Sequence, residues 1–96
     1  MCHNIDPALE NEIVETAKLY GIDKIILFGS RARGDNRERS DIDLAVSGKN
    51  VADFYDDIEE NTHTLLMFDV VALDGKLSDE LRKEIEKDGV VLYEKV

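Results

Sequence analysis

Three aspartates in this 96-residue sequence have the residue type and the positions needed to bind a divalent cation. Asp41 and Asp43 flank Ile42 in the segment Asp-Ile-Asp-Leu-Ala-Val, which has the composition of a β-strand. Side chains two residues apart in a strand lie on the same face, roughly 6.6 Å apart along it. Asp69 stands in the most apolar stretch of the chain, where a buried strand favours a hydrocarbon side chain.

These three carboxylates converge on one patch if the strands that carry them are neighbours in a sheet. Without a cation they repel, by up to ~4 kcal/mol for a pair about 4 Å apart at an effective dielectric near 20. Hard divalent cations prefer such oxygen ligands, and phosphoryl or nucleotidyl transfer uses two Mg²⁺ ions about 3.5–4 Å apart. The absence of histidine and thiolate from the set argues against zinc. Taken alone, an Asp-x-Asp pair is equally typical of a half-exposed strand.

A second element is Gly29-Ser30, which directly follows the apolar run Lys-Ile-Ile-Leu-Phe. Backbone N–H groups at a junction of strand and helix form an anion site, and glycine lets a phosphate approach closely. A plain turn glycine is the alternative. The segment is not a Walker A loop, because Asp35 stands where the lysine is required.

Charge is strongly acidic overall, with a formal net charge of −10, yet four of the five arginines fall within residues 31–39. They are Arg31, Arg33, Arg37 and Arg39. This window is a candidate anion-binding segment. Arg31 and Arg33 could contact phosphate or pair with acids such as Asp35 or Asp41. The acidic balance of the whole chain argues against direct nucleic-acid binding.

The elements that position these residues alternate between helix and strand. We predict helices over about 7–20, 51–60 (capped by Asn50) and from Ser78 to about Asp88, with strands at 24–28, 41–46, 64–73 and 90–93. This order indicates one α/β or α+β domain over residues 1–96, a small mixed sheet with helices packed on one face. No run is long enough to span a membrane, and the N-terminus lacks a signal-peptide pattern, which indicates a cytoplasmic protein.

Two segments together resemble the signature of a known family: Phe28-Gly29-Ser30-Arg31-Ala32-Arg33-Gly34 and Ser40-Asp41-Ile42-Asp43-Leu44-Ala45-Val46. The signature is the Gly-Ser…Asp-x-Asp pattern of the DNA polymerase beta nucleotidyltransferase superfamily, in particular of its minimal nucleotidyltransferases. The resemblance covers nearly the whole chain and implies a mixed three-stranded central sheet with the active site opposite the helices. It implies that Asp41 and Asp43 hold two Mg²⁺ ions, and that Asp69 completes one metal site and helps deprotonate the acceptor hydroxyl. Gly29 and Ser30 would bind the β- and γ-phosphates of ATP, with Arg31 and Arg33 as further nucleotide contacts.

By the same resemblance, the chain would transfer AMP from ATP to an acceptor hydroxyl. Similar minimal nucleotidyltransferases are often antitoxins that attach AMP to a tyrosine of a HEPN-domain toxin. Two alternatives stay open: a catalytically inert partner-binding module of the same fold, and the catalytic half of a two-chain small-molecule enzyme resembling kanamycin nucleotidyltransferase.

Strand alternation predicts an apolar surface beside the site, because Leu65, Met67, Val71 and Leu73 share a face with Asp69. If the helices cover only the opposite face, these side chains are exposed. We therefore expect a partner protein, or a second copy of this chain, to cover them.

Overall fold

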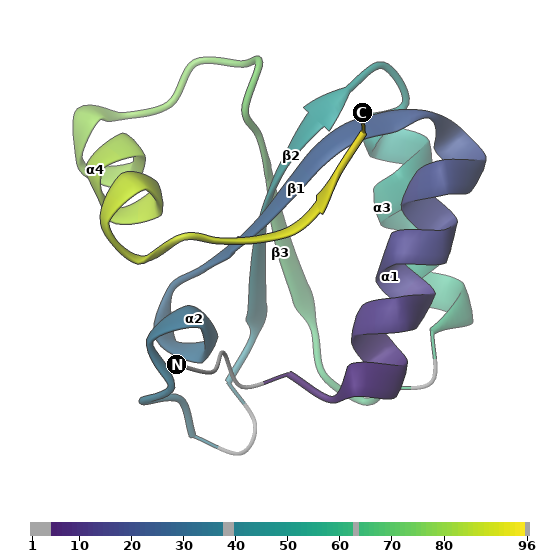
Figure 1. Ribbon diagram of the computed structural model, residues 1–96, viewed down its shortest axis with the longest axis horizontal. Helices are drawn as coiled ribbons and strands as arrows, with labels where there is room; N and C mark the ends of the chain where they lie inside the picture. The colour runs from purple at the N-terminus through teal and green to yellow at the C-terminus, as the bar shows by residue number, and fades with distance from the viewer. Residues whose placement is uncertain (1–4, 38–39, 63, 96) are drawn as a thin grey trace.

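The computed structural model describes residues 5–37, 40–62 and 64–95, which form four strands and four helices around one sheet (Figure 1). In chain order the elements are α1 (Pro7–Tyr20), β1 (Ile22–Phe28), α2 (Ser30–Arg33), β2 (Ile42–Gly48), α3 (Val51–Asn61), β3 (Phe68–Ala72), α4 (Asp79–Asp88) and β4 (Val90–Glu94). The predicted alternation of helix and strand is confirmed.

The sheet is mixed, as predicted, with strand order β3-β2-β1-β4. Strand β1 pairs antiparallel with both β2 and β4, whereas β2 and β3 run parallel. The resemblance implied three central strands, and the short last strand adds a fourth at the β1 edge. The connection between the parallel strands is α3, since parallel neighbours need a crossover.

Helices α1 and α3 cover one face of the sheet and bury the main core (Figure 1). Leu9, Ile13 and Ala17 recur every four residues on α1, so all three face the sheet and are buried. Local sequence sets the ends of this helix. Asp6 Oδ1 accepts a hydrogen bond from the N–H of Ala8 at 3.0 Å, and Gly21, at φ +70°, ends the helix.

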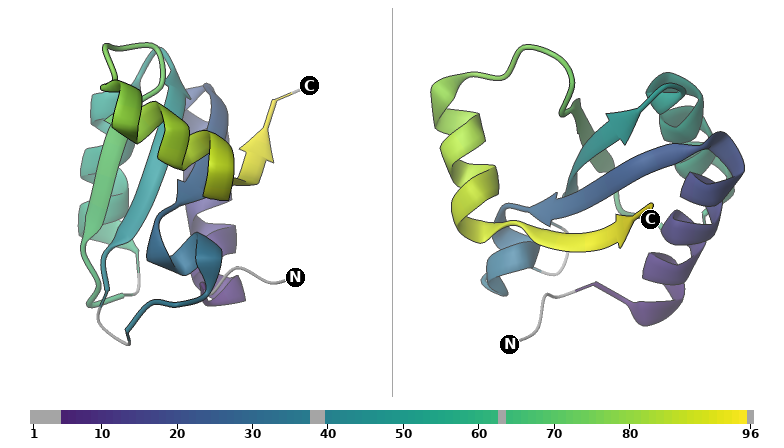
Figure 2. Two further views of the ribbon diagram at one scale, coloured as in Figure 1. Left: turned by 90° about the vertical axis from the view of Figure 1, so that its left-hand side faces the viewer. Right: turned by 45° about the horizontal axis from the view of Figure 1, so that its top comes forward.

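Helix α4 corrects the expectation that all helices lie on one face. It lies across the opposite face of the sheet from α1 and α3 (Figure 2). Its buried residue Ile85 packs against Phe28 and Ala45, and the half-buried Val71 and Leu73 join this second cluster. Alternation along β2 leaves Ala45 facing away from the main core, so a second apolar patch exists there that one amphipathic helix can cover.

Strand β3 is shorter than the predicted strand at 64–73. It begins at Phe68 because its neighbour β2 begins at Ile42, where the N–H of Ile42 donates to the carbonyl of Met67 at 2.9 Å. Before that point the chain turns, with the Thr64 hydroxyl accepting from the N–H of Leu66 at 3.1 Å. An apolar composition without a neighbouring strand is not enough to form a β-strand.

Asn50 stands at the predicted N-cap position of α3, but its side chain does not cap the helix. Its amide nitrogen instead donates to the carbonyl of Tyr20 at 2.9 Å, which ties the start of α3 to the end of α1. Ser78 does cap α4 as predicted, through a 3.1 Å hydrogen bond from the N–H of Leu81. In the described ranges no helix is long and apolar enough to cross a membrane.

Candidate active site

The sheet register brings the predicted carboxylates together. Asp43 on β2 is paired with Asp69 on the parallel strand β3 and with Phe28, the last residue of β1. Register partners on neighbouring strands lie about 4.8 Å apart with their side chains on the same face. Asp41 is exposed and directly precedes β2, two residues before Asp43. The three aspartates therefore gather at the end of β1, β2 and β3 nearest to α2.

The neighbouring carboxylates affect the pKa of Asp43. The pKa of the Asp43 carboxyl is raised from 3.8 to about 6, first by burial and then by the negative charges of Asp69, Asp41 and Glu84, with an opposing effect of Arg33. Three acidic neighbours therefore act on one half-buried carboxylate. The direction of the shift is the one that like charges produce when no cation lies between them.

The donor set fits a hard divalent cation, since it consists of carboxylate oxygens at a half-buried position. As they stand in the described parts of the chain, no three His, Cys, Asp or Glu side chains are close enough together to hold a metal ion. Mutual repulsion turns carboxylates apart, so the side chains would have to rotate toward a shared cation. The assignment of Asp41, Asp43 and Asp69 as metal ligands stays a prediction.

The Gly29-Ser30 turn lies against this group and requires glycine. Gly29 has φ +77° and ψ −155°, and a Cβ added there would collide with Oδ2 of Asp43 and lie 3.3 Å from its Cγ. The short helix α2 begins directly at Ser30, with the N–H groups of Ala32 and Arg33 both donating to the Gly29 carbonyl at 3.2 Å. Only a residue without a side chain allows the turn this close to the carboxylate.

Arg31 has a structural position that sequence reasoning did not anticipate. Its side chain is buried, only 6% exposed, and its Nε donates to the backbone carbonyl of Ser40 at 3.0 Å. Ser40 directly precedes Asp41, so Arg31 fixes the segment that enters β2. This contact favours a positioning role, and a direct contact of Arg31 with nucleotide stays a prediction.

Arg33 pairs with acids, which is one of the two alternatives that the sequence left open. Its Nε donates to Asp35 at 3.0 Å, and its terminal nitrogen Nη1 lies 3.2 Å from Asp88 and 3.8 Å from Glu84 on α4. These pairs are consistent with a pKa of Arg33 above its usual value, chiefly through the hydrogen bonds to Asp35 and Asp88. Arg39 of the predicted arginine window lies outside the described residues, and Arg37 is exposed.

Sequence reasoning missed the two acidic residues that α4 contributes beside the site. Glu84 and Asp88 are four residues apart and share one side of the helix, next to the buried Ile85. An acidic i, i+4 pair beside an apolar contact residue is a detectable pattern. Its relevance depends on which face of the sheet receives α4, and the local sequence does not contain that information.

A glycine turn after β1, an Asp-x-Asp pair at the start of β2 and a parallel strand with a third aspartate are the arrangement expected of a nucleotidyltransferase on an α/β sheet. The family profile described as polymerase beta nucleotidyltransferase matches residues 11–96, so the chain belongs to this family and is a nucleotidyltransferase enzyme.

A curated relative and solved structures agree with this membership. The Methanocaldococcus jannaschii protein named "putative protein adenylyltransferase" is 38% identical over 81 residues, which cover 75% of this chain and 79% of the relative. A crystal structure of a toxin–antitoxin with AMP-PNP is 26% identical with a TM-score of 0.71, over 90% of this chain and 73% of that one.

A third likeness concerns the fold alone. It is to a structure of a tri-AMPylated Shewanella oneidensis HEPN toxin in complex with an MNT antitoxin, at 23% identity and a TM-score of 0.64, over 91% of this chain and 71% of that one. The predicted membership in the polymerase beta nucleotidyltransferase superfamily is confirmed by the family profile.

Proposed function

We propose that this nucleotidyltransferase transfers AMP from ATP to a tyrosine hydroxyl of a HEPN-type partner, as a cytoplasmic antitoxin. The observation that carries the proposal is the register pairing of Asp43 with Asp69, next to the glycine turn that follows β1. The name of the M. jannaschii relative and the AMP-PNP in a similar toxin–antitoxin structure support ATP as the substrate and a protein as the acceptor.

In the proposed reaction, the acceptor oxygen forms a bond to the α-phosphorus of ATP. The bond from that phosphorus to the oxygen bridging to the β-phosphate breaks, and pyrophosphate leaves. The hydroxyl proton passes to a carboxylate oxygen of Asp69. The Gly29-Ser30 turn binds the β- and γ-phosphates through backbone N–H groups and the Ser30 hydroxyl.

Asp41 and Asp43 would hold two Mg²⁺ ions, and Asp69 would complete one of the two sites. When bound, these ions neutralise charge on the phosphate oxygens and favour the ionised acceptor. A bound cation would then reduce the repulsion between Asp43 and Asp69. This repulsion is one cause of the raised pKa of Asp43.

An inert binding module is the weaker hypothesis because of the same electrostatics. Paired carboxylates at a half-buried position destabilise the fold unless a cation offsets them. A protein that only bound a partner would gain nothing from this arrangement.

The test is transfer of label from ATP labelled at the α-phosphate to a purified HEPN-type protein. We expect labelling that requires Mg²⁺ and falls on the order of 10²-fold or more in Asp41→Asn and Asp43→Asn. Asp23→Asn, at an exposed position near the start of β1, is the matched control and should label normally. Undiminished labelling by the Asp41→Asn, Asp43→Asn double variant would refute the mechanism, and mass spectrometry of the product tests whether tyrosine is the acceptor.

A further inference from the structure

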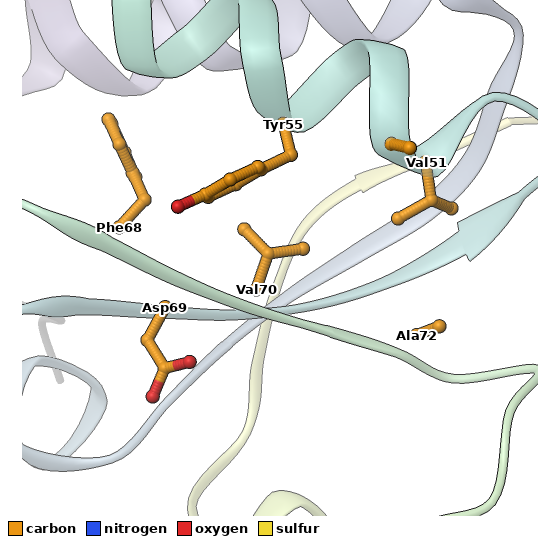
Figure 3. A pocket seen from close by; sticks show the side chains of 7 residues that line it. Val51, Tyr55, Phe68, Asp69, Val70 and Ala72 are labelled. Carbon is orange, nitrogen blue, oxygen red and sulfur yellow. The ribbon is translucent and has the colours of Figure 1, made fainter.

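An apolar groove lies between α3 and the free edge of β3, on the opposite side of that strand from the carboxylate of Asp69. Its cavity volume is about 440 Å³. Val51, Ala52 and Tyr55 line it from α3, and Phe68, Val70 and Ala72 line it from β3. Figure 3 shows Tyr55, Phe68 and Val70 on the α3 side of the strand, while the Asp69 side chain points the other way.

Two large apolar side chains lie in the segment that leads into β3, the strand that lines this groove. Leu65 is fully exposed, at 103%, and Met67 is 62% exposed, and both come directly before β3. The main-chain carbonyl of Met67 pairs with Ile42, so the backbone here is anchored while the side chains face solvent. Exposed apolar side chains next to an apolar groove mark an interaction site.

The segment of the chain that forms the groove carries acidic residues and no Lys or Arg. Residues 50–75 contain no Lys or Arg and seven acidic residues, namely Asp53, Asp56, Asp57, Glu59, Glu60, Asp69 and Asp74. Glu59 accepts a hydrogen bond from the N–H of Phe68 at 3.3 Å, which places one of these carboxylates at the start of β3. Asp69 in the lining and Glu59 at the start of β3 are both acidic, and a partner that matches them carries Lys or Arg around its apolar contact.

The position of Asp69 connects this surface with the active site. Asp69 borders the groove and is also the register partner of Asp43. Since β3 is the edge strand, a protein seated in the groove can reach the carboxylates around the free side of that strand. A second copy of this chain fits poorly, because it carries the same net charge of −10.

We propose that the α3–β3 groove, together with Leu65 and Met67, is the docking surface for the protein that receives AMP, and that this partner presents an apolar contact flanked by basic residues. The inference rests on the proposed function, because it assigns the surface that holds the acceptor of that reaction.

The test is the dissociation constant of this chain for a purified HEPN-type protein, measured by calorimetry without ATP. Leu65→Lys and Met67→Lys should each weaken binding at least tenfold, because they replace an apolar contact with a charge that repels a basic partner. Leu19→Lys is the matched control, since Leu19 is 75% exposed but lies on α1, and it should stay within twofold of the parent. Thermal melts of each variant check that the fold is retained.

The groove and its charge are tested separately. Ala52→Arg places a long basic side chain in the groove and should also weaken binding at least tenfold. Asp56→Lys should weaken binding more than Glu86→Lys, a charge reversal at an exposed position on α4. Affinity of the parent should fall as the salt concentration rises.

The outcomes separate this inference from the proposed function. If the parent transfers AMP but Leu65→Lys and Met67→Lys bind like the parent, the docking surface is wrong and the function stands. If the variants lose binding while no AMP is transferred, the surface is supported and the function fails. A homodimer of the parent that Leu65→Lys dissociates would overturn the basic partner in favour of a second copy.

Discussion

At the scale of single residues, Asp43 has an environment that differs from water in both burial and charge. It is half-buried, touches the position where a Cβ of residue 29 would lie, and is surrounded by the charges of Asp69, Asp41 and Glu84. The space between Gly29 and the Asp43 carboxylate is too small for a side chain. A substitution at Gly29 would therefore displace the Asp43 carboxylate, which is proposed to bind metal. The turn and the strand therefore act as one unit.

This environment predicts how stability depends on pH. The pKa of Asp43 in the folded protein, about 6, lies above its ordinary value of 3.8, so the fold favours the protonated form. The associated stability is fully present below about pH 4 and is lost as the pH rises through about 6. In EDTA, Asp43→Asn should therefore be more stable than the parent at pH 7.5, by about 1–2 kcal/mol after allowance for solvent screening.

Urea unfolding at pH 3.5, 6 and 7.5 checks this prediction, and the difference between the two proteins should nearly vanish at the lowest pH. Glu60→Gln, at an exposed position on α3, is the control and should change stability by less than about 0.5 kcal/mol. Parallel curves for the parent and Asp43→Asn would mean that the acidic neighbours do not act on Asp43.

At the level of elements, α4 is the helix whose attachment affects the site. Two kinds of contact hold it: the buried Ile85 against Phe28 and Ala45, and the pairs of Arg33 with Asp88 and Glu84. The apolar contact is the stronger, because truncation of a buried isoleucine to alanine costs about 2–5 kcal/mol. A partly exposed ion pair contributes about 0–1 kcal/mol.

Arg33→Ala should therefore change global stability little, and the loss should be local. Hydrogen exchange should show faster exchange of the amides in Asp79–Asp88 and little change in α1. Lys18→Ala, which removes an exposed pair with Glu15, is the control and should leave α4 unchanged. Equal protection of α4 in the parent and Arg33→Ala would show that Ile85 alone holds the helix.

For the whole molecule, the site couples global stability to ligand binding. Asp69 contributes to the repulsion at Asp43, so Asp69→Asn should melt at a higher temperature than the parent in EDTA. Mg²⁺ with AMP-PNP should reverse the order. The ligand stabilises the parent by about 2.7 kcal/mol at a hundredfold excess over Kd, and should stabilise a variant with a weakened metal site much less.

Thermal melts in EDTA and in millimolar Mg²⁺ with AMP-PNP provide the comparison, and they require no knowledge of the acceptor. Asp74→Asn is a poor control because its carboxylate accepts from the N–H of Gly48, whereas Asp53→Asn lies away from the site and should respond to ligand as the parent does. If Mg²⁺ and nucleotide stabilise the parent and Asp69→Asn equally, Asp69 has no part in binding them.

Much of this molecule follows from local sequence. Residues a few positions apart determine three of its features: the two ends of α1 at Asp6-Pro7 and Gly21, the Ser78 cap of α4, and the burial of Ile42, Leu44 and Val46. The placement of Asp43 on the face opposite Ile42 and Leu44 follows from the same short-range alternation, whereas Asp41, predicted inside the strand, directly precedes it. These features could be predicted because backbone geometry sets them within one turn or one strand.

Other features depend on residues far apart in the chain, and only the tertiary structure decided them. Packing between distant segments places β3 parallel to β2, with Asp69 opposite Asp43. It also sets the start of β3 where β2 begins, and it places α4 on the second face of the sheet. The pairing of Arg33 with α4 and of Arg31 with the carbonyl of Ser40 has the same origin. A local pattern specifies which side of an element is apolar, but the element that covers that side is selected by the free energy of the whole packed chain.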